Sequence, residues 1–343
     1  MKSRAVLGLS LLLLTACDCG GSGPTGSGGG GDGGGGNVSG DGGSDAASNG
    51  SGDGGGADAG SGNGDAGSGV NDAGLLLPSC AERANYIYVV DNGDVLYRFD
   101  PHPATMGFTQ IGTGPLNCGA TGSHPFSMAV DHDAVAWVLF DNHKVYQVST
   151  VDGACTGGTA ATPATWTTYG MGFSSNMPYP NSLAETLFLG GGTNGSPAKL
   201  ATMNLTTFAV TEIGNLSGNP ELTGNGNAEL WGFLPDTNPS SIKQIDKTNA
   251  TAIATYALNQ NNPDSLTVTT GSGSRRWAFA FWGGDYYVFY KAAQESSTNV
   301  YRFRPPRNGN AESFTRIITN SGKQIVGAGV STCAQVVPPI DIQ

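Results

Sequence analysis

No segment of this sequence is apolar over the roughly 20 residues that a transmembrane helix needs. The longest apolar run, residues 5–14, follows Lys2 and Arg4 and has the length of the apolar region of an export signal. The sequence therefore excludes an ordinary helical membrane protein and predicts a chain that is exported.

Positive charge is also scarce. The chain carries 16 Lys and Arg against 27 Asp and Glu, a formal net charge of −11. Part of this acidity belongs to residues 20–74, which contain no Lys, Arg or aromatic residue, 26 glycines and seven aspartates, whereas residues 75–343 carry a net charge of only −5. Nucleic-acid binding requires a basic surface, so we expect no nucleic-acid partner.

The sequence patterns of common enzymes and metal sites are missing. No serine has the flanking glycines of a nucleophile elbow, no phosphate-binding loop is present, and no CxxC spacing indicates a zinc site. Asp131-His132-Asp133 is the only compact set of metal-ligand residue types, and its setting favours a turn between two strands. We therefore assign no catalytic residue, expect no metal or cofactor, and favour a binding protein over an enzyme.

Cys17 stands where the apolar run ends. The preceding residues complete the tetrapeptide Leu14-Thr15-Ala16-Cys17, which resembles the lipobox of bacterial lipoproteins. In that family the signal is removed before the cysteine, whose thiol and amino group are acylated. The resemblance implies a signal peptide at 1–16 and a lipid, such as palmitate, on Cys17, with several chains each contributing about 0.8 kcal/mol per buried CH₂. An ordinary secretory signal is the alternative, and Cys19 receives no role.

Residues 17–74 have almost no apolar side chain to bury. We expect this lipidated segment to be a disordered tether, with a root-mean-square span of roughly 40 Å for a Gly/Ser-rich coil of this length. Its Gly/Asp alternation also resembles a calcium-binding repeat array. Such arrays need a large apolar residue in each repeat, and here only Val38 and Val70 are available, which favours the tether.

Residues 75–343 read as one all-β domain built from a recurring unit. Each unit has a strand of small residues followed by three more strands, with polar turns between them. Equivalent positions lie 44, 51, 57 and 48 residues apart, at Met128, Gly172, Thr223, Ala280 and Ala328. Four-stranded units at this spacing predict a single β-propeller of five blades. Six blades are the alternative, because 266–270 has the composition of an extra strand.

The fifth small-residue strand, 325–332, lies at the C-terminal end, whereas the first unit lacks one. Pairing this strand with the first three closes the ring and leaves no open blade edge. Cys80 directly precedes the first unit and Cys333 directly follows the last strand. Closure therefore predicts a Cys80–Cys333 disulfide and leaves Cys118 to pair with Cys155, which suits an oxidising compartment.

Residues 277–290 (WAFAFWGGDYYVFY) are the most distinctive stretch of the domain. They indicate either packing between blades or an aromatic platform for a ligand, in which Trp282, Asp285 and Tyr286 contact a sugar or peptide. Arg275 and Arg276, together with the arginines at 302, 304 and 307, are candidates for an anion-attracting patch. Solvated turns and edge strands explain these arginines equally well.

The lipobox, the Gly/Ser/Asp tract and this aromatic blade together resemble surface lipoproteins of myxobacterial type. The resemblance implies an exported, lipid-anchored protein at the outer membrane or cell surface, with the inner membrane or periplasm as the alternative because of Asp18. We expect a monomeric module that binds a protein or a glycan. The alternatives are a propeller lyase or glycan hydrolase acting at the central channel, and a structural envelope component without a ligand.

Overall fold

The computed structural model describes residues 80–156, 162–193, 197–237, 239–258, 266 and 274–338. The signal peptide, Cys17, Cys19 and the tether lie outside the described residues, so the expectations about them stay predictions. Within the described ranges the chain is all-β, with twenty strands and one four-residue 3₁₀ helix, η1 (Glu82–Asn85). This part of the chain has no helix with the length and hydropathy of a membrane span.

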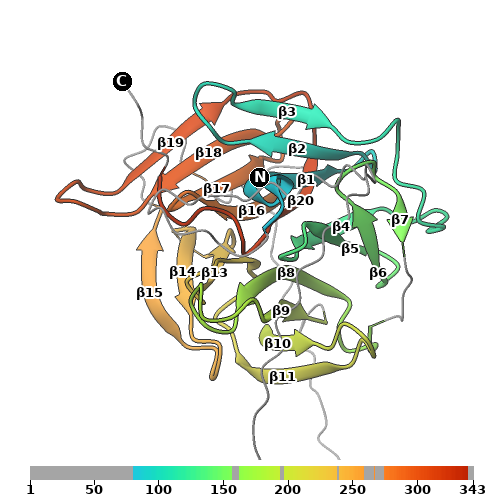
Figure 1. Ribbon diagram of the computed structural model, residues 1–343, viewed down its shortest axis with the longest axis horizontal. Coiled ribbons are helices and arrows are strands. Elements are labelled where there is room, and N and C mark those ends of the chain that lie inside the picture. Colours follow the sequence, from blue (N-terminus) through green and yellow to red (C-terminus); the bar gives the residue numbers. More distant parts are fainter. Residues whose placement is uncertain are drawn as a thin grey trace, which may run out of the picture. The chain divides into compact units, whose positions relative to one another are not determined.

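The strands form five four-stranded antiparallel sheets, arranged as blades around an axis (Figure 1). Blade 1 comprises β20 (Ile325–Val330), β1 (Ile87–Asp91), β2 (Leu96–Asp100) and β3 (Gly107–Gln110). Blade 2 comprises β4 (Pro125–Val130), β5 (Val135–Phe140), β6 (Val145–Ser149) and β7 (Cys155–Thr156). Blade 3 comprises β8 (Thr168–Ser175), β9 (Glu185–Gly192), β10 (Lys199–Met203) and β11 (Val210–Asn215). Blade 4 comprises β12 (Glu221–Gly224), β13 (Leu230–Leu234), β14 (Ser241–Ile245) and β15 (Ala252–Ala257). Blade 5 comprises β16 (Arg276–Trp282), β17 (Asp285–Lys291), β18 (Asn299–Arg304) and β19 (Ser313–Ile318).

The predicted small-residue strands are the innermost strands of the five blades. Their glycines allow close approach between blades: a Cβ on Gly172 of β8 would lie 2.9 Å from the carbonyl carbon of Leu222 in β12. A Cβ on Gly329 of β20 would lie 2.8 Å from the carbonyl carbon of Ala129 in β4. Side chains larger than hydrogen would push these inner strands apart, which explains their composition.

The C-terminal strand closes the ring, as the sequence predicted. β20 pairs antiparallel with β1, from Ile87 opposite Val330 to Asp91 opposite Ile325. The Cys80–Cys333 disulfide joins the two chain segments just outside this pairing, and Cys118–Cys155 forms the second disulfide. Five blades are therefore confirmed, and the alternative of six is wrong.

Most blade contacts are filled by aromatic rings. Between blades 5 and 1, Phe99 packs against Tyr287 and Phe289 at centroid distances of 6.0 and 5.4 Å. Between blades 4 and 5, Trp231 packs against Tyr286 at 4.9 Å. The aromatic stretch 277–290 thus serves the packing of blade 5 against both neighbours.

Candidate ligand-binding site

The hairpin between β16 and β17 positions the first candidate residues. Trp282 pairs with Asp285 across Gly283 and Gly284, whose φ values of +60° and +76° suit the tight turns that join twisted antiparallel strands. A Cβ on Gly284 would lie 2.6 Å from Nη1 of Arg307, so glycine here admits that arginine. The backbone of this turn, which lies between the predicted ligand contacts Trp282 and Asp285, therefore approaches Arg307 closely.

Asp285 is surrounded by three arginines. Arg307 donates to its Oδ1 through Nη2, and Arg304 donates to its Oδ2 through Nη2 at 3.2 Å. Nε of Arg302 lies 3.8 Å from the same Oδ2. The side chain of Asp285 is 6% exposed, whereas that of Arg304 is 42% exposed. One buried carboxylate therefore offsets only part of three positive charges.

Strand register explains why these side chains meet. In β17 and β18, Tyr286 pairs with Phe303 and Tyr287 pairs with Arg302. Because side chains alternate between the two faces of a sheet, Tyr287, Arg302 and Arg304 share the face of Asp285. This face packs against blade 1 through Phe99, so the arginines lie at the edge of the contact between blades 5 and 1.

A small cleft opens beside this group, which we call the arginine cleft. It has a volume of about 50 Å³ and is lined by Pro101, Pro103, Trp282, Gly283, Asp285, Tyr287, Arg302, Arg304 and Pro338. Arginine presents a planar fork of donors that matches the two oxygens of a carboxylate. The arginine cleft therefore has the chemistry to bind an anionic group next to an apolar, proline-lined rim.

The structure separates the other predicted contact residues from this cleft. Tyr286 is 3% exposed, and its ring packs between blades 4 and 5, on the face opposite Asp285. Arg275 pairs with Asp236, and Arg276 donates to Gln324 at 3.2 Å. Both arginines lie at the other end of β16, about 20 Å away at roughly 3.3 Å per strand residue. Of the candidates that the sequence indicated, Trp282, Asp285, Arg302 and Arg304 line the cleft, whereas Tyr286, Arg275 and Arg276 do not.

Trp282 contributes mainly to the fold. Its side chain is buried, at 6% residue exposure, and Nε1 donates to the backbone oxygen of Asn85 at 2.7 Å. Arg302, Arg304 and Arg307 supply the exposed polar groups instead. The alternation of Arg302 and Arg304 in one strand was visible in the sequence, but their convergence on Asp285 depends on register.

A second polar cluster joins the ends of strands in blades 1, 2 and 3. Nδ1 of His132 lies 3.0 Å from Oε1 of Glu185, and Thr332 donates to Oε2 at 2.6 Å. Tyr179 OH lies 2.7 Å from the Thr332 hydroxyl. Burial opposes the charge on His132, but the hydrogen bond and charge of Glu185 outweigh this and raise the pKa of the imidazole.

Both oxygens of Glu185 already accept hydrogen bonds, so the cluster links three blades and leaves neither carboxylate oxygen without a partner. Burial raises the pKa of the Glu185 carboxyl, although the hydrogen bonds from Thr332 and His132 lower it. The 131–133 segment forms the turn between β4 and β5 that the sequence favoured, with Asp131 accepting from the Val135 amide at 2.8 Å. Glu185 was missed because its partner lies 53 residues away in the chain.

A buried carboxyl also lies on an inner strand. Glu221 of β12 is 5% exposed and accepts a hydrogen bond from Ser127 of β4 at 3.0 Å. Burial raises the pKa of Glu221 well above its ordinary value. In the described part of the chain, no three His, Cys, Asp or Glu side chains are grouped to hold a metal ion.

No protein-family model matches the sequence, and comparison with curated proteins gave no match. Among solved structures, the chain is similar to a protein of unknown function from Bacteroides caccae, with 11% identity and a TM-score of 0.35, over 71% of this chain and 97% of that one. It is also similar to TolB from Acinetobacter baumannii, with 11% identity and a TM-score of 0.38, over 67% and 52%. A third match is the extracellular domain of a hybrid two-component system from B. thetaiotaomicron, with 10% identity and a TM-score of 0.35, over 70% and 28%. The five-bladed assignment rests on the strand pairing of this chain itself.

Proposed function

We propose that this chain is a lipid-anchored envelope protein whose propeller binds a carboxylate-bearing glycan at the arginine cleft. The observation that carries this proposal is the grouping of Arg302, Arg304 and Arg307 around the single carboxylate of Asp285. An anionic group that enters beside Asp285 meets guanidinium groups whose positive charge is only partly neutralised.

The rim of the arginine cleft supports a glycan. Pro101, Pro103 and Pro338 line it with apolar rings that have no N–H donor. The C–H face of a sugar ring fits such a surface while its carboxylate meets Arg304. The cleft volume of about 50 Å³ suits one charged group and leaves the rest of the ligand on the surface.

The lyase or hydrolase that the sequence offered as an alternative would act at the central channel, whereas the arginine cleft bears only on hydrolysis within the cleft itself. That chemistry uses two carboxyl groups about 5–10 Å apart on either side of the scissile bond. Among the described residues that line the cleft, Asp285 is the only carboxylate, and its oxygens are engaged by arginines. Binding without turnover is the better account.

Titration of a soluble oligouronate into the protein tests the binding proposal. We expect Arg304→Gln to weaken binding by about tenfold or more, because a hydrogen bond to a charged group contributes roughly 1.5–3 kcal/mol. Arg83→Gln is the matched control, since Arg83 is exposed and donates to the backbone of Asp133, outside the cleft. Equal affinity of both variants, or equal binding of the neutral oligosaccharide, would reject the cleft as the glycan site.

The lipid anchor rests on the sequence and needs its own test. We expect Cys17→Ala to move the protein from the membrane fraction to the soluble fraction, with loss of the acyl mass in mass spectrometry of the N-terminal peptide. Cys19→Ala is the control and should leave the protein in the membrane fraction. Unchanged membrane retention of Cys17→Ala would contradict the anchor.

A further inference from the structure

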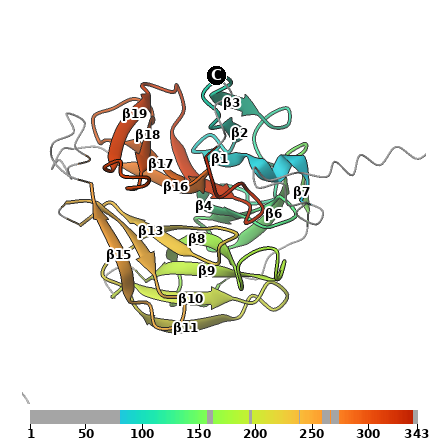
Figure 2. The ribbon, with the colours of Figure 1, turned by 60° about the vertical axis from the view of Figure 1, so that its left-hand side comes forward.

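The contact between blades 3 and 4 is packed differently from its neighbours. Its buried cluster is mainly aliphatic and consists of Phe188, Leu200, Leu222, Leu230, Ile245 and Ala250. Blades 3 and 4 lie side by side in both ribbon views (Figures 1 and 2). Without the aromatic rings that fill the other contacts described above, the outer part of this contact stays open.

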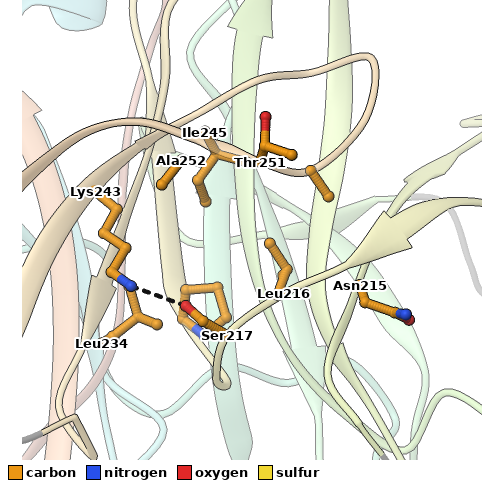
Figure 3. Close-up of a pocket in the computed structure, with 10 residues that line it drawn as sticks. Asn215, Leu216, Ser217, Leu234, Lys243, Ile245, Thr251 and Ala252 are labelled. Atoms are coloured by element: carbon orange, nitrogen blue, oxygen red, sulfur yellow. Dashed lines mark hydrogen bonds between the residues drawn. The ribbon is translucent and has the colours of Figure 1, made fainter.

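The open part is a cleft of about 280 Å³, which we call the aliphatic cleft (Figure 3). Its apolar lining comprises Leu216, Pro220, Leu234, Ile245, Ala250 and Ala252, and its polar lining comprises Asn215, Ser217, Lys243 and Thr251. Pro220 packs closely against two glycines, because Cβ atoms on Gly190 and Gly232 would lie 2.7 and 2.9 Å from its ring. The aliphatic cleft is thus mostly apolar and separate from the arginine cleft.

One cation stands at an end of the aliphatic cleft. Nζ of Lys243 donates to Oγ of Ser217 at 2.9 Å (Figure 3). Among the described residues, no carboxylate lies within ion-pair distance of Lys243. An ammonium group has three donors, so Lys243 retains capacity for a further acceptor while its stem lines the apolar wall.

We propose that the aliphatic cleft binds a medium-chain aliphatic carboxylate, with the carboxylate at Lys243 and Ser217 and the chain against Leu234 and Ile245. The charge of Lys243 selects an anionic head, and the apolar walls select an alkyl chain over a sugar. The volume of about 280 Å³ admits an alkyl chain of medium length, and octanoate serves as the probe.

Binding of octanoate to the mature chain carrying Cys17→Ala tests this site, with octylamine and octanol as probes of the head group. We expect octanoate to bind, octylamine to bind at least about tenfold more weakly, and saturation transfer NMR to place the alkyl chain in contact with protein. Lys243→Met keeps the length and apolar character of the stem. This variant should lower the affinity for octanoate by about tenfold and leave the affinity for octanol unchanged.

A second variant fills the cleft without touching the cation. Ala252→Phe places a ring at the rim of the cleft and should abolish binding of both octanoate and octanol. Thermal unfolding of each variant establishes that it is folded. Absence of octanoate binding to the parent chain, or octanoate affinity unaffected by Lys243→Met and Ala252→Phe, would overturn the proposal. An octapeptide ending in leucine serves as the competing carboxylate, and its preferential binding would also overturn the assignment to a free aliphatic acid.

Discussion

Asp285 is the one acidic side chain among three arginines, and its replacement should change two properties in opposite directions. Asp285→Asn removes the negative charge and replaces one carboxylate oxygen by an NH₂ donor that faces the guanidinium groups, so it should lower the free energy of unfolding by about 2 kcal/mol. For a domain of this size the melting temperature should fall by about 4–8 °C. The same change leaves the arginines without their counter-charge and should tighten oligouronate binding, as measured by titration calorimetry.

Glu312→Gln is the control for this change, because Glu312 is exposed in the loop before β19. It should alter neither stability nor binding. Weaker oligouronate binding by Asp285→Asn would mean that Asp285 itself contacts the ligand, contrary to the anion-binding account.

Glu221 gives a pH dependence whose sign follows from its burial. Burial raises its folded pKa, against the hydrogen bond from Ser127, so its contribution to stability is full below the unfolded pKa. That contribution is lost as pH rises through the folded value. The free energy of unfolding of the natural chain should therefore fall relative to that of Glu221→Gln as pH rises above the ordinary carboxyl pKa of 4.5, as measured by urea denaturation at a series of pH values.

Glu312→Gln provides the comparison, since Glu312 is exposed in the loop before β19. The free energy of unfolding of this variant should depend on pH in the same way as that of the natural chain. The same pH dependence for Glu221→Gln would show that Glu221 does not resist ionisation in the folded protein.

At the scale of elements, β20 is the strand that determines closure. It is the last strand of the chain and pairs with the first, β1. The Cys80–Cys333 disulfide beside this pairing joins residues 253 positions apart in the sequence, whereas Cys118–Cys155 joins residues 37 positions apart. In the chain-entropy account, a longer loop gives a greater stabilisation. Removing Cys80–Cys333 should cost roughly 2 kcal/mol more than removing Cys118–Cys155.

Urea denaturation of the paired Cys→Ser variants measures this difference. Each variant is compared with the natural chain at the same protein concentration, and its m-value is fitted separately because loss of a cross-link changes the surface exposed in the unfolded chain. A greater cost for Cys118–Cys155 would show that strain or residual structure, and not loop closure at the ring, controls the stability of the domain.

The inner strands were predictable from sequence because their small residues recur at a regular spacing and have one physical use, close packing at the axis. The same pattern of small residues predicted that β20 pairs with β1. This ring closure in turn predicted the pairing of the cysteines in both disulfides. The arginine cleft was only half predictable. Asp285 and Trp282 stand at a visible Gly-Gly turn, whereas grouping Arg304 with Asp285 requires the register of β17 and β18. Arg275 and Arg276 lie at the start of β16, whereas Trp282 lies at its end, next to the cleft.

The aliphatic cleft was not predictable at all. One of its lining residues, Pro220, packs against Gly190 and Gly232, which come from different blades. Sequence periodicity shows that each of these residues lies in or near a strand. It does not show how closely two blades approach, which decides whether the space between them is filled.

At the scale of the whole molecule, the two clefts lie at different blade contacts. The arginine cleft belongs to blades 5 and 1, and the aliphatic cleft to blades 3 and 4, so blades 4 and 5 separate them on one side of the ring. Distant sites without shared partners act independently. Saturating octanoate should therefore leave oligouronate affinity unchanged within about twofold in calorimetric titrations, and a larger change would indicate coupling through the ring.

The most direct measurement of the central claim is binding of the mature chain carrying Cys17→Ala to an array of acidic and neutral glycans and acidic peptides. Our account predicts retention on uronate-bearing glycans, loss of that signal in Arg304→Gln, and no turnover of the bound glycans. Retention on neutral glycans alone, on peptides alone, or release of cleaved products would contradict it.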